Sequence, residues 1–277
     1  MKKFILTLLA ISMFSLATIA NAKTIRIGTE GAYPPWNNLN TAGQLEGAEI
    51  DFGNEACLRM GVECEWVTQD WDGIIPALLN GKYDIIIAGM SITEERKEKV
   101  NFTDGYMTDG ARFAVLKGSG LEDMTIAGMD KVNLNDAGGK EQAAIGQLNA
   151  AMKGKTVCVQ SATIHQNYLE KHMAGVVEVK LYQSVDDTNL DLLAGRCDAI
   201  LADVGSTIDY MSTDVGANVA FTGPTFSGGV FGDGVGGAVK KEDTEILEMW
   251  NAAIAEMLAD GSLSEITKQW FGRDISM

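Results

Sequence analysis

The chain has 277 residues, of which 22 are basic and 38 acidic, and its formal net charge at pH 7 is −16. Because nucleic acid and anionic membrane surfaces would repel such a charge at long range, we expect neither as a partner. The length allows one or two domains with a large buried core.

Residues 1–22 have the pattern of a cleaved export signal. Two lysines precede a short apolar stretch, and small residues stand at Ala20 and Ala22, as a signal peptidase requires. A membrane anchor is the alternative, but the apolar run is short and a polar, strand-like segment follows it at Lys23. No lipidation cysteine lies near the cleavage point, so we expect a free mature protein in the periplasm of a Gram-negative cell.

Strand-like and helix-like segments alternate along residues 24–90. Residues 24–29 alternate apolar and polar side chains and stop at the turn-forming sequence GAYPPW. Apolar spacing then predicts a helix over 49–60, a strand over 64–68, a helix over 72–82 and a buried strand over 83–90. This alternation predicts an α/β fold whose parallel sheet is covered by helices on both faces.

The same alternation restarts after residue 150, which favours a second α/β unit. Before the restart, residues 118–150 are rich in Gly, Asp and Asn and lack a strong period, so we expect a surface excursion or a partly ordered insertion in the second unit, which ends in a helix. The expected elements of the second unit are strands over 156–162, 177–183 and 197–203 and helices over 163–173 and 187–196.

A glycine-dense stretch covers residues 221–239. It matches no dinucleotide-binding fingerprint, because no helix opens directly after it, and a hinge or crossing strand explains it better. Two amphipathic helices are predicted behind it, over 243–261 and 263–272.

The four cysteines are expected to form two disulfides, because the export signal implies an oxidising compartment. Cys57 and Cys64 bracket a short loop, whose closure would stabilise the fold by about 2–3 kcal/mol in the loop-entropy model. Cys158 and Cys197 lie within or at the start of strand-like segments, which favours a bridge between neighbouring strands, with two buried thiols as the alternative. No metal site is expected, because no Cys-x-x-Cys spacing occurs and the histidines lie near only one cysteine in the sequence.

Polar residues stand where the predicted parallel strands end. No nucleophile elbow and no phosphate-binding loop occurs, so the signals for an enzyme are weak. In open α/β sheets, ligands bind beyond the carboxyl ends of the strands. The candidates at these ends are Glu30, Tyr33, Gly89, Ser91 and Asp203.

Arg96 lies in the first turns of a predicted helix that Thr93 opens. A cation gains nothing from the dipole at this helix end, so its placement makes sense if it holds an anion. Free N–H groups around Ser91 would complete a clamp for a carboxylate. The alternative is a surface arginine paired with Glu94 or Glu95.

Asp203 follows a buried strand and would be costly to bury without a cation. A ligand ammonium is one candidate partner, and a helix N-cap role is the alternative. Trp36 and Trp71 are candidates to stack on a ligand, although aromatic residues near strand ends lie more often in the core. We expect His165 and His172 at the surface.

The chain resembles periplasmic solute-binding proteins for polar amino acids, the bacterial extracellular solute-binding proteins of family 3, and within them the lysine/arginine/ornithine- and opine-binding branch. The resemblance covers essentially the whole mature chain and is weakest near residues 120–150. The motifs that carry it are, in order, IRIGTEGAYPPW, EIDFGNEACLRMGVECEWV, WDGIIPALLNGKYDIIIAGMSITEERKEKVNFTDGY, GRCDAILAD, FGDGVGGAV and LADGSLSEITKQWFG.

The resemblance implies a two-lobe periplasmic-binding-protein fold of type II, in which two hinge strands join two α/β lobes that close on the ligand. The family also has a helix-to-strand bridge in lobe 1 and a strand-to-strand bridge in lobe 2, like the two pairs expected here. The implied segments are lobe 1 at 23–111 and 233–277, lobe 2 at 112–232 with its insertion at about 118–150, and hinges near 109–114 and 227–235.

The resemblance also implies which groups hold the two ends of an amino acid. Arg96 would bind the α-carboxylate, helped by the backbone N–H groups of Ser91 and Thr163. Asp203, with hydroxyl and carbonyl groups near Gly89 and Ser91, would bind the α-ammonium.

Trp71 and Tyr33 would then sandwich the ligand side chain, and Glu30 would face its far end. A carboxylate in a closed, partly dry cleft needs a cation, so Glu30 favours arginine, ornithine, lysine or an arginine-derived opine. Ala88 and Gly89 stand where serines are common in the basic amino-acid binders, which leaves room for a bulkier ligand such as an opine.

The implied function is the periplasmic substrate-binding component of an ABC transporter. It would be a monomer without cofactor or catalytic activity that serves a permease in the inner membrane. The main alternative is a periplasmic dehydratase on the same scaffold, with Glu30 or Asp203 as general acid or base on a cyclic carboxylate. The pairing of Arg96 with Asp203 suits a zwitterion and favours binding. A chemoreceptor sensor domain is disfavoured, because no membrane span precedes the ending FGRDISM.

Overall fold

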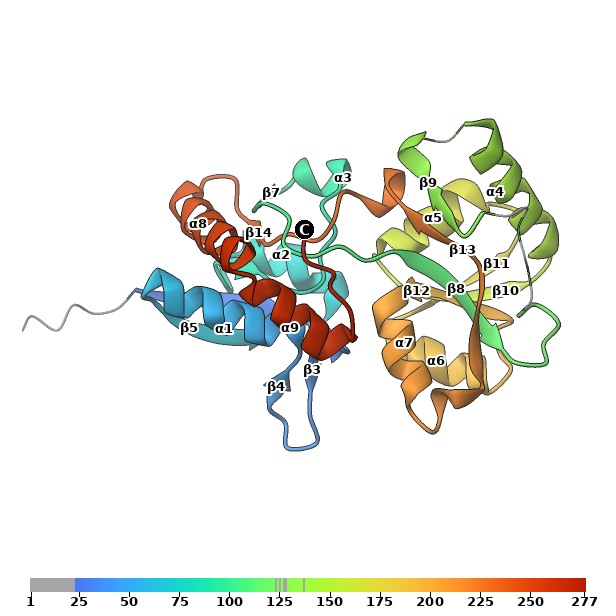
Figure 1. The fold of residues 1–277 in the computed structure, drawn as a ribbon, viewed down its shortest axis with the longest axis horizontal. Coiled ribbons are helices and arrows are strands. Elements are labelled where there is room, and N and C mark those ends of the chain that lie inside the picture. Colours follow the sequence, from blue (N-terminus) through green and yellow to red (C-terminus); the bar gives the residue numbers. More distant parts are fainter. Residues whose placement is uncertain (1–22, 123, 125, 127–128, 137) are drawn as a thin grey trace, which may run out of the picture.

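The computed structural model describes residues 23–122, 124, 126, 129–136 and 138–277. The predicted export signal at 1–22 lies outside the described residues. The chain folds into two lobes that lie side by side and are joined by crossing segments (Figure 1). In the described part of the chain, no helix has both the length and the apolar character needed to cross a membrane.

The first lobe is built on a five-stranded sheet in the order β5-β1-β6-β14-β7. Strand β1 pairs in parallel with β5 and β6, as predicted, but β14 runs antiparallel to β6 and β7, because the chain enters β14 on its way back from the second lobe. The sheet is therefore mixed rather than parallel. Its strands are β1 Thr24–Thr29, β5 Glu63–Thr68, β6 Ile85–Ile86, β7 Asn101–Phe102 and β14 Ala238–Val239.

Helices cover this sheet, and a small antiparallel sheet in the order β2-β3-β4 stands beside it. The small strands are β2 Ala32–Tyr33, β3 Asn37–Leu39 and β4 Leu45–Glu46. The helices are α1 Ala48–Met60, the 3-10 turn η1 Trp71–Gly73, α2 Ile74–Leu79, α3 Glu94–Lys97, α8 Thr244–Asp260 and α9 Ser262–Phe271.

The second lobe is built on a six-stranded sheet in the order β11-β10-β12-β8-β13-β9. Strand β10 pairs in parallel with β11 and β12, and β8 runs antiparallel to β12 and β13. The strands are β8 Ala111–Leu116, β9 Lys131–Asn133, β10 Thr156–Gln160, β11 Glu178–Tyr182, β12 Ala199–Asp203 and β13 Val219–Ser227. The helices are α4 Gly139–Ala151, α5 Ile164–His172, α6 Val185–Leu193 and α7 Val204–Ser212, with 3-10 turns η2 Leu134–Asp136, η3 Gly216–Asn218 and η4 Gly229–Phe231.

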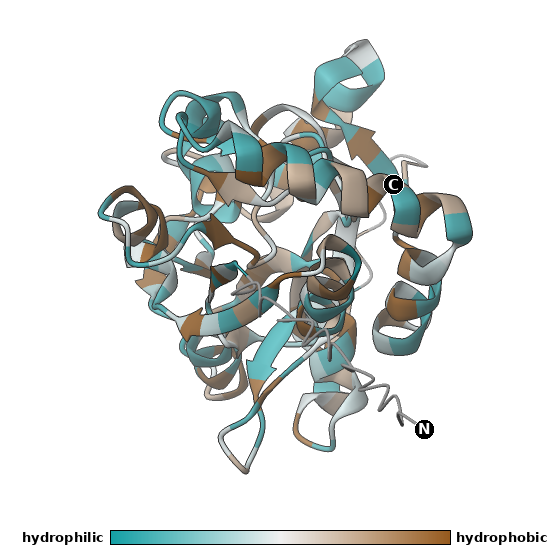
Figure 2. Ribbon diagram, turned by 90° about the vertical axis from the view of Figure 1, so that its left-hand side faces the viewer, coloured by the Kyte–Doolittle hydropathy of each residue, from teal (hydrophilic) through white to brown (hydrophobic). Residues whose placement is uncertain are grey.

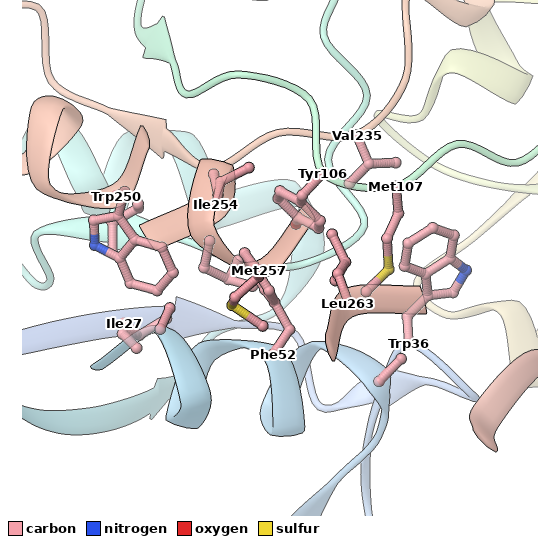
Figure 3. Close-up of a cluster of buried hydrophobic side chains, with 14 of the residues drawn as sticks. Ile27, Trp36, Phe52, Tyr106, Met107, Val235, Trp250, Ile254, Met257 and Leu263 are labelled. Atoms are coloured by element: carbon pink, nitrogen blue, oxygen red, sulfur yellow. The ribbon is translucent and has the colours of Figure 1, made fainter. Parts of the chain in front are cut away.

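The core of the first lobe lies between α1, α8 and α9. Figure 3 shows Trp250 of α8 and Phe52 of α1 in the same buried cluster, with ring centroids 5.9 Å apart. Phe52 also stacks on Tyr106 at 4.4 Å. Polar and apolar residues alternate around the helices in Figure 2, as expected of helices that bury one face.

Both predicted disulfides are formed. Cys57 near the end of α1 pairs with Cys64 in β5, with a Cα–Cα distance of 6.2 Å. Cys158 in β10 pairs with Cys197, which lies two residues before the neighbouring strand β12, with a Cα–Cα distance of 5.9 Å. The alternative of two buried thiols is wrong, and the described residues contain no free cysteine.

The described residues of the segment 118–150 include the helix that we expected at its end, α4, and also a strand, β9, that we did not expect. Strand β9 pairs in parallel with β13, and its Val132 is fully buried. Helix α4 adds Ala144 and Leu148 to the core of the second lobe. The sequence did not reveal β9, because a three-residue strand with one apolar side chain has no detectable period.

The two crossing segments lie side by side between the lobes. Val235 on the returning segment pairs antiparallel with Met107 on the outgoing one. Next along the outgoing segment, the Asp109 carboxylate accepts hydrogen bonds from Gly205 N–H in α7 at 2.6 Å and from Arg273 Nη2 at 2.7 Å. Both lobes therefore meet at Asp109.

The last residues of the chain run along the same crossing segment (Figure 1). The Thr108 N–H donates to Ile275 O at 2.8 Å, and the Met277 N–H donates to Tyr106 O at 3.2 Å. This pairing ties residues 275–277 to the outgoing segment between the lobes.

Candidate functional site

One cleft between the lobes gathers every residue that the family resemblance assigned to the ligand. The volume between its atoms is about 330 Å³, which includes the part of the cleft that is open to solvent. That these residues bind a ligand stays a prediction. The predicted residues that line the cleft are Glu30, Tyr33, Trp71, Gly89, Ser91, Arg96, Thr163 and Asp203, and Ala88, Gln160, Ile164 and His165 lie among them.

Arg96 is held at the cleft wall by α3 and its N-cap. The Thr93 side chain caps this short helix by accepting a hydrogen bond from the Arg96 N–H at 3.3 Å. The guanidinium donates from Nη1 to Ser91 O at 3.0 Å and lies over Trp71, 5.2 Å from the ring centroid. Desolvation lowers the pKa of Arg96 to about 10, so the side chain is a cation at neutral pH.

The alternative that Arg96 forms a surface ion pair with its neighbours is wrong. Glu94 pairs with Lys97, and Glu95 accepts a hydrogen bond from Asn167 in the other lobe. Within the part of the chain that the structure describes, no carboxylate forms an ion pair with Arg96. A half-buried guanidinium with unused donors is a ready site for an anion.

Asp203 faces the cleft from the end of β12. Asp203 occupies the N-cap position of α7, but its side chain makes no capping hydrogen bond. The alternative that this side chain caps the helix is therefore wrong. Its Oδ2 accepts from the Tyr33 hydroxyl across the cleft at 2.8 Å, and its Oδ1 lies 3.1 Å from Nε2 of His165.

His165 is buried, with 5% of its surface exposed, so the prediction of a surface residue is wrong. It lies in the first turn of α5 on the face that also buries Tyr168 and Leu169. The spacing of these apolar residues was the signal that could have placed His165 inward. His172 is only half-buried and stacks on the Tyr168 ring at 5.0 Å.

Glu30 follows β1 and is the second carboxylate of the cleft. Its Oε1 accepts a hydrogen bond from Gln160 Nε2 of the second lobe at 2.6 Å. Desolvation raises the pKa of Glu30 to about 7, against the lowering effect of that hydrogen bond. Sequence reasoning missed Gln160, whose partner lies far away in the chain.

Aromatic side chains wall the cleft on the first lobe. Tyr33 and Trp71 are both nearly buried, and Trp71 Nε1 donates to Ala162 O of the second lobe at 3.1 Å. Ala162 has a φ of 58°, a left-handed conformation that is unusual outside glycine. Trp36, the other candidate for stacking, is fully buried against Phe271 and belongs to the core.

The succession of elements and motifs around this cleft matches a family profile over residues 25–273. The chain belongs to the bacterial extracellular solute-binding proteins, family 3. It is 38% identical over 279 residues to the L-arginine-binding protein of Pseudomonas aeruginosa, which covers 99% of this chain and 98% of that protein. It is 34% identical over 276 residues to the octopine-binding periplasmic protein of Rhizobium meliloti, with 93% of each chain covered.

Solved structures agree with this assignment. The chain is similar to an ancestral arginine-binding protein bound to arginine, with 35% identity, a TM-score of 0.75, and coverage of 90% of this chain and 98% of that one. The two-lobe type II fold and the solute-binding function predicted from the sequence are confirmed. The relatives are binding proteins rather than enzymes, which supports the prediction that this chain is not an enzyme.

In this solute-binding protein, a buried carboxylate that the sequence analysis missed braces the cleft from behind. Glu49 in α1 is fully buried and accepts hydrogen bonds from Gly89 N–H at 2.7 Å, the Tyr106 hydroxyl at 2.5 Å and Asn37 Nδ2 at 2.8 Å. Asn37 in turn accepts from Gly31 N–H at 2.7 Å. This network fixes the two turns that carry Glu30 and Gly89.

Proposed function

We propose that this solute-binding protein captures an amino acid or amino-acid derivative with a cationic side chain, of the arginine class. The observation that carries the proposal is the half-buried guanidinium of Arg96, which has no carboxylate partner among the described residues and faces the same cleft as the carboxylates of Glu30 and Asp203. Groups of opposite charge in one cleft are complementary to such a ligand.

Arg96 would hold the ligand carboxylate. Guanidinium and carboxylate groups form two parallel charge-assisted hydrogen bonds, which are stronger than neutral ones. The N-terminus of α5, where Thr163 is the N-cap, adds backbone N–H groups to the same anion site.

Glu30 would hold the cationic end of the ligand side chain. With a pKa of about 7, Glu30 is only partly ionised at neutral pH in the unliganded cleft. A neighbouring cation favours the ionised form and lowers the pKa, so binding releases protons near neutral pH. The affinity for the cation therefore rises as the pH is raised towards and above 7.

The aromatic side chains and the small residues of the cleft would limit the size of the ligand that can bind. Tyr33 and Trp71 would enclose its side chain, and Asp203 would hold its α-ammonium. Gly89 has a φ of 60°, which glycine adopts without strain, and with Ala88 it leaves space beside the α-nitrogen. The ligand would then be a free amino acid or an N-substituted derivative, as in the relatives named L-arginine-binding protein and octopine-binding periplasmic protein.

In the proposed function, the protein is a periplasmic monomer that delivers its bound ligand to an ABC permease in the inner membrane. Lobe 1 would comprise residues 23–111 and 233–277 and lobe 2 residues 112–232, with bending near 109–114 and 227–235. Closure that joins the lobes around a ligand gives a permease a shape to recognise.

A calorimetric and thermal-shift panel tests the ligand. A ligand at a hundred times its dissociation constant adds about 2.7 kcal/mol to the free energy of unfolding. We expect a raised midpoint with arginine, lysine, ornithine or octopine, reduced in Glu30→Gln. A response confined to neutral or acidic amino acids would refute the role of Glu30, and no response together with turnover of prephenate would favour the dehydratase.

A further inference from the structure

His165 is a titratable side chain in the cleft that the proposed function does not use. Its Nε2 lies 3.1 Å from Asp203 Oδ1, and the Tyr33 hydroxyl donates to the other oxygen of the same carboxylate. Both oxygens of the group proposed to hold the α-ammonium therefore already have protein partners.

The pair is well enclosed. The side chains of His165 and Asp203 expose 7% and 14% of their surface, and the His165 ring lies 6.1 Å from the Phe231 ring. Solvent screening of a charge on the imidazole is weak in such a place. The charged or titratable groups that share the surroundings of the pair are Arg96, Tyr33, Glu30 and Glu49 of the first lobe and Asp109 of the crossing segment.

We propose that His165 sets the selectivity of the cleft for the α-ammonium of its ligand, by competing with that ammonium for Asp203. This inference rests on the proposed function. A protonated His165 forms an ion pair with Asp203, and a ligand ammonium must then share a carboxylate whose charge is already compensated. When His165 is neutral, the negative charge of Asp203 is not compensated by the imidazole and can pair with the ligand ammonium.

The consequence is a selectivity that changes with pH. At low pH the cleft gains little from an α-ammonium, so ligands whose α-nitrogen is absent or substituted bind nearly as well as a free amino acid. At higher pH the free amino acid gains a charge-assisted hydrogen bond to Asp203. One such bond corresponds to about a tenfold change in affinity.

Two ligands isolate this effect. Arginine and desaminoarginine carry the same carboxylate and guanidinium and differ in the α-ammonium, so the contributions of Arg96 and Glu30 cancel in the ratio of their dissociation constants. Calorimetry at about pH 5.5 and about pH 7.5 brackets the range in which imidazoles titrate. We expect the preference of the wild-type protein for arginine to rise about tenfold between these values.

Two variants assign the effect to one side chain. His165→Gln can still donate to Asp203 but carries no charge, so its preference for arginine should not depend on pH. His172→Gln is the matched control, because His172 lies on the same helix but stacks on Tyr168 outside the cleft. The control should behave like the wild-type protein.

The possible outcomes distinguish a failure of the role of His165 from a failure of the proposed function. If both ligands bind and the preference of His165→Gln changes with pH like that of the wild-type protein, His165 has no such role. If the wild-type protein binds neither ligand, the proposed function fails and the inference fails with it.

A measurement on the wild-type protein covers the case in which His165→Gln does not fold. The chain has two histidines, and His172→Gln assigns their NMR signals. Adding arginine should shift the His165 ring signals towards those of the neutral imidazole, because the ammonium is a like charge beside it. Desaminoarginine should not, and equal shifts with the two ligands would overturn the inference.

Discussion

The two walls of the cleft are supported in different ways. On the first lobe, Gly89 and the turn behind Glu30 are held from behind by the buried Glu49 network, and the Arg96 guanidinium is held by Ser91 of the same lobe. On the second lobe, Asp203 and Gln160 have partners in their own lobe, His165 and Gln183 O, but each also forms a hydrogen bond across the gap to the first lobe.

The contacts across the gap are direct hydrogen bonds. Asp203 is held by Tyr33 and Gln160 by Glu30, both from the first lobe. From this comparison we expect the first lobe to present a preformed half of the site, to which a ligand would bind first, and closure to complete the other half. Such a site would couple ligand capture to domain movement, because the Tyr33–Asp203 and Gln160–Glu30 contacts exist only when the lobes meet.

The disulfides give the largest expected difference between the lobes. The bridge Cys158–Cys197 spans 39 residues and the bridge Cys57–Cys64 spans 7. The loop-entropy model therefore predicts a loss of about 4 kcal/mol in the free energy of unfolding when the first is replaced by serines, and about 2.5 kcal/mol for the second. Denaturant unfolding of the two double variants measures both values, and equal losses would show that native contacts rather than loop closure decide the stability.

Arg96→Ala should remove most of the binding. Loss of a bidentate carboxylate contact predicts an affinity at least about a hundredfold lower by calorimetry. The unfolding midpoint without ligand should fall little, because Arg96 has no carboxylate partner in the described structure and the variant loses one contact with Ser91 O and one with the Trp71 ring. Lys97→Ala on the same helix is the control and should bind normally. Normal binding by Arg96→Ala would place the ligand carboxylate elsewhere.

Glu49→Gln tests whether the first wall is preformed. Both oxygens of Glu49 accept hydrogen bonds, and glutamine would put an N–H donor in place of one of these acceptors. The loss should lower the free energy of unfolding by about 1–3 kcal/mol and weaken arginine binding about tenfold. Glu63→Gln at an exposed position of β5 is the control. If Glu49→Gln lost stability but kept its affinity, the network would support the fold without shaping the site.

Tyr33→Phe tests the dependence of the second wall on closure. It removes the hydroxyl that reaches Asp203 and keeps the aromatic ring, so the affinity should fall about fivefold, as for one neutral donor. The loss should appear mainly as faster ligand release in stopped-flow fluorescence, because the contact forms on closure. A slower association rate with unchanged release would indicate that this contact exists before the lobes close.

The parts of the structure that the sequence predicted correctly have local signals. The helix around Phe52 and the strand around Ile27 are fixed by the spacing of neighbouring apolar residues, and Cys57 and Cys64 are close in the chain. The cleft residues lie at strand ends, where ligand sites of α/β proteins gather.

The parts that the sequence did not predict depend on partners far away in the chain. Gln160 meets Glu30, 130 residues distant, and Glu49 meets Gly89, 40 residues distant. The burial of His165 has a local signal in the apolar spacing of α5, but its contact with Asp203 at the end of β12 has none. Such buried polar contacts have no period, so only the assembled fold reveals them.

The pairing of residues 275–277 with the outgoing crossing segment matters for building an optical sensor. A fluorescent domain fused behind Met277 would be attached to the segment that joins the lobes, through Tyr106 and Thr108. Its orientation would then follow the bending of that segment. This end of the chain is therefore the place from which to report ligand capture in real time.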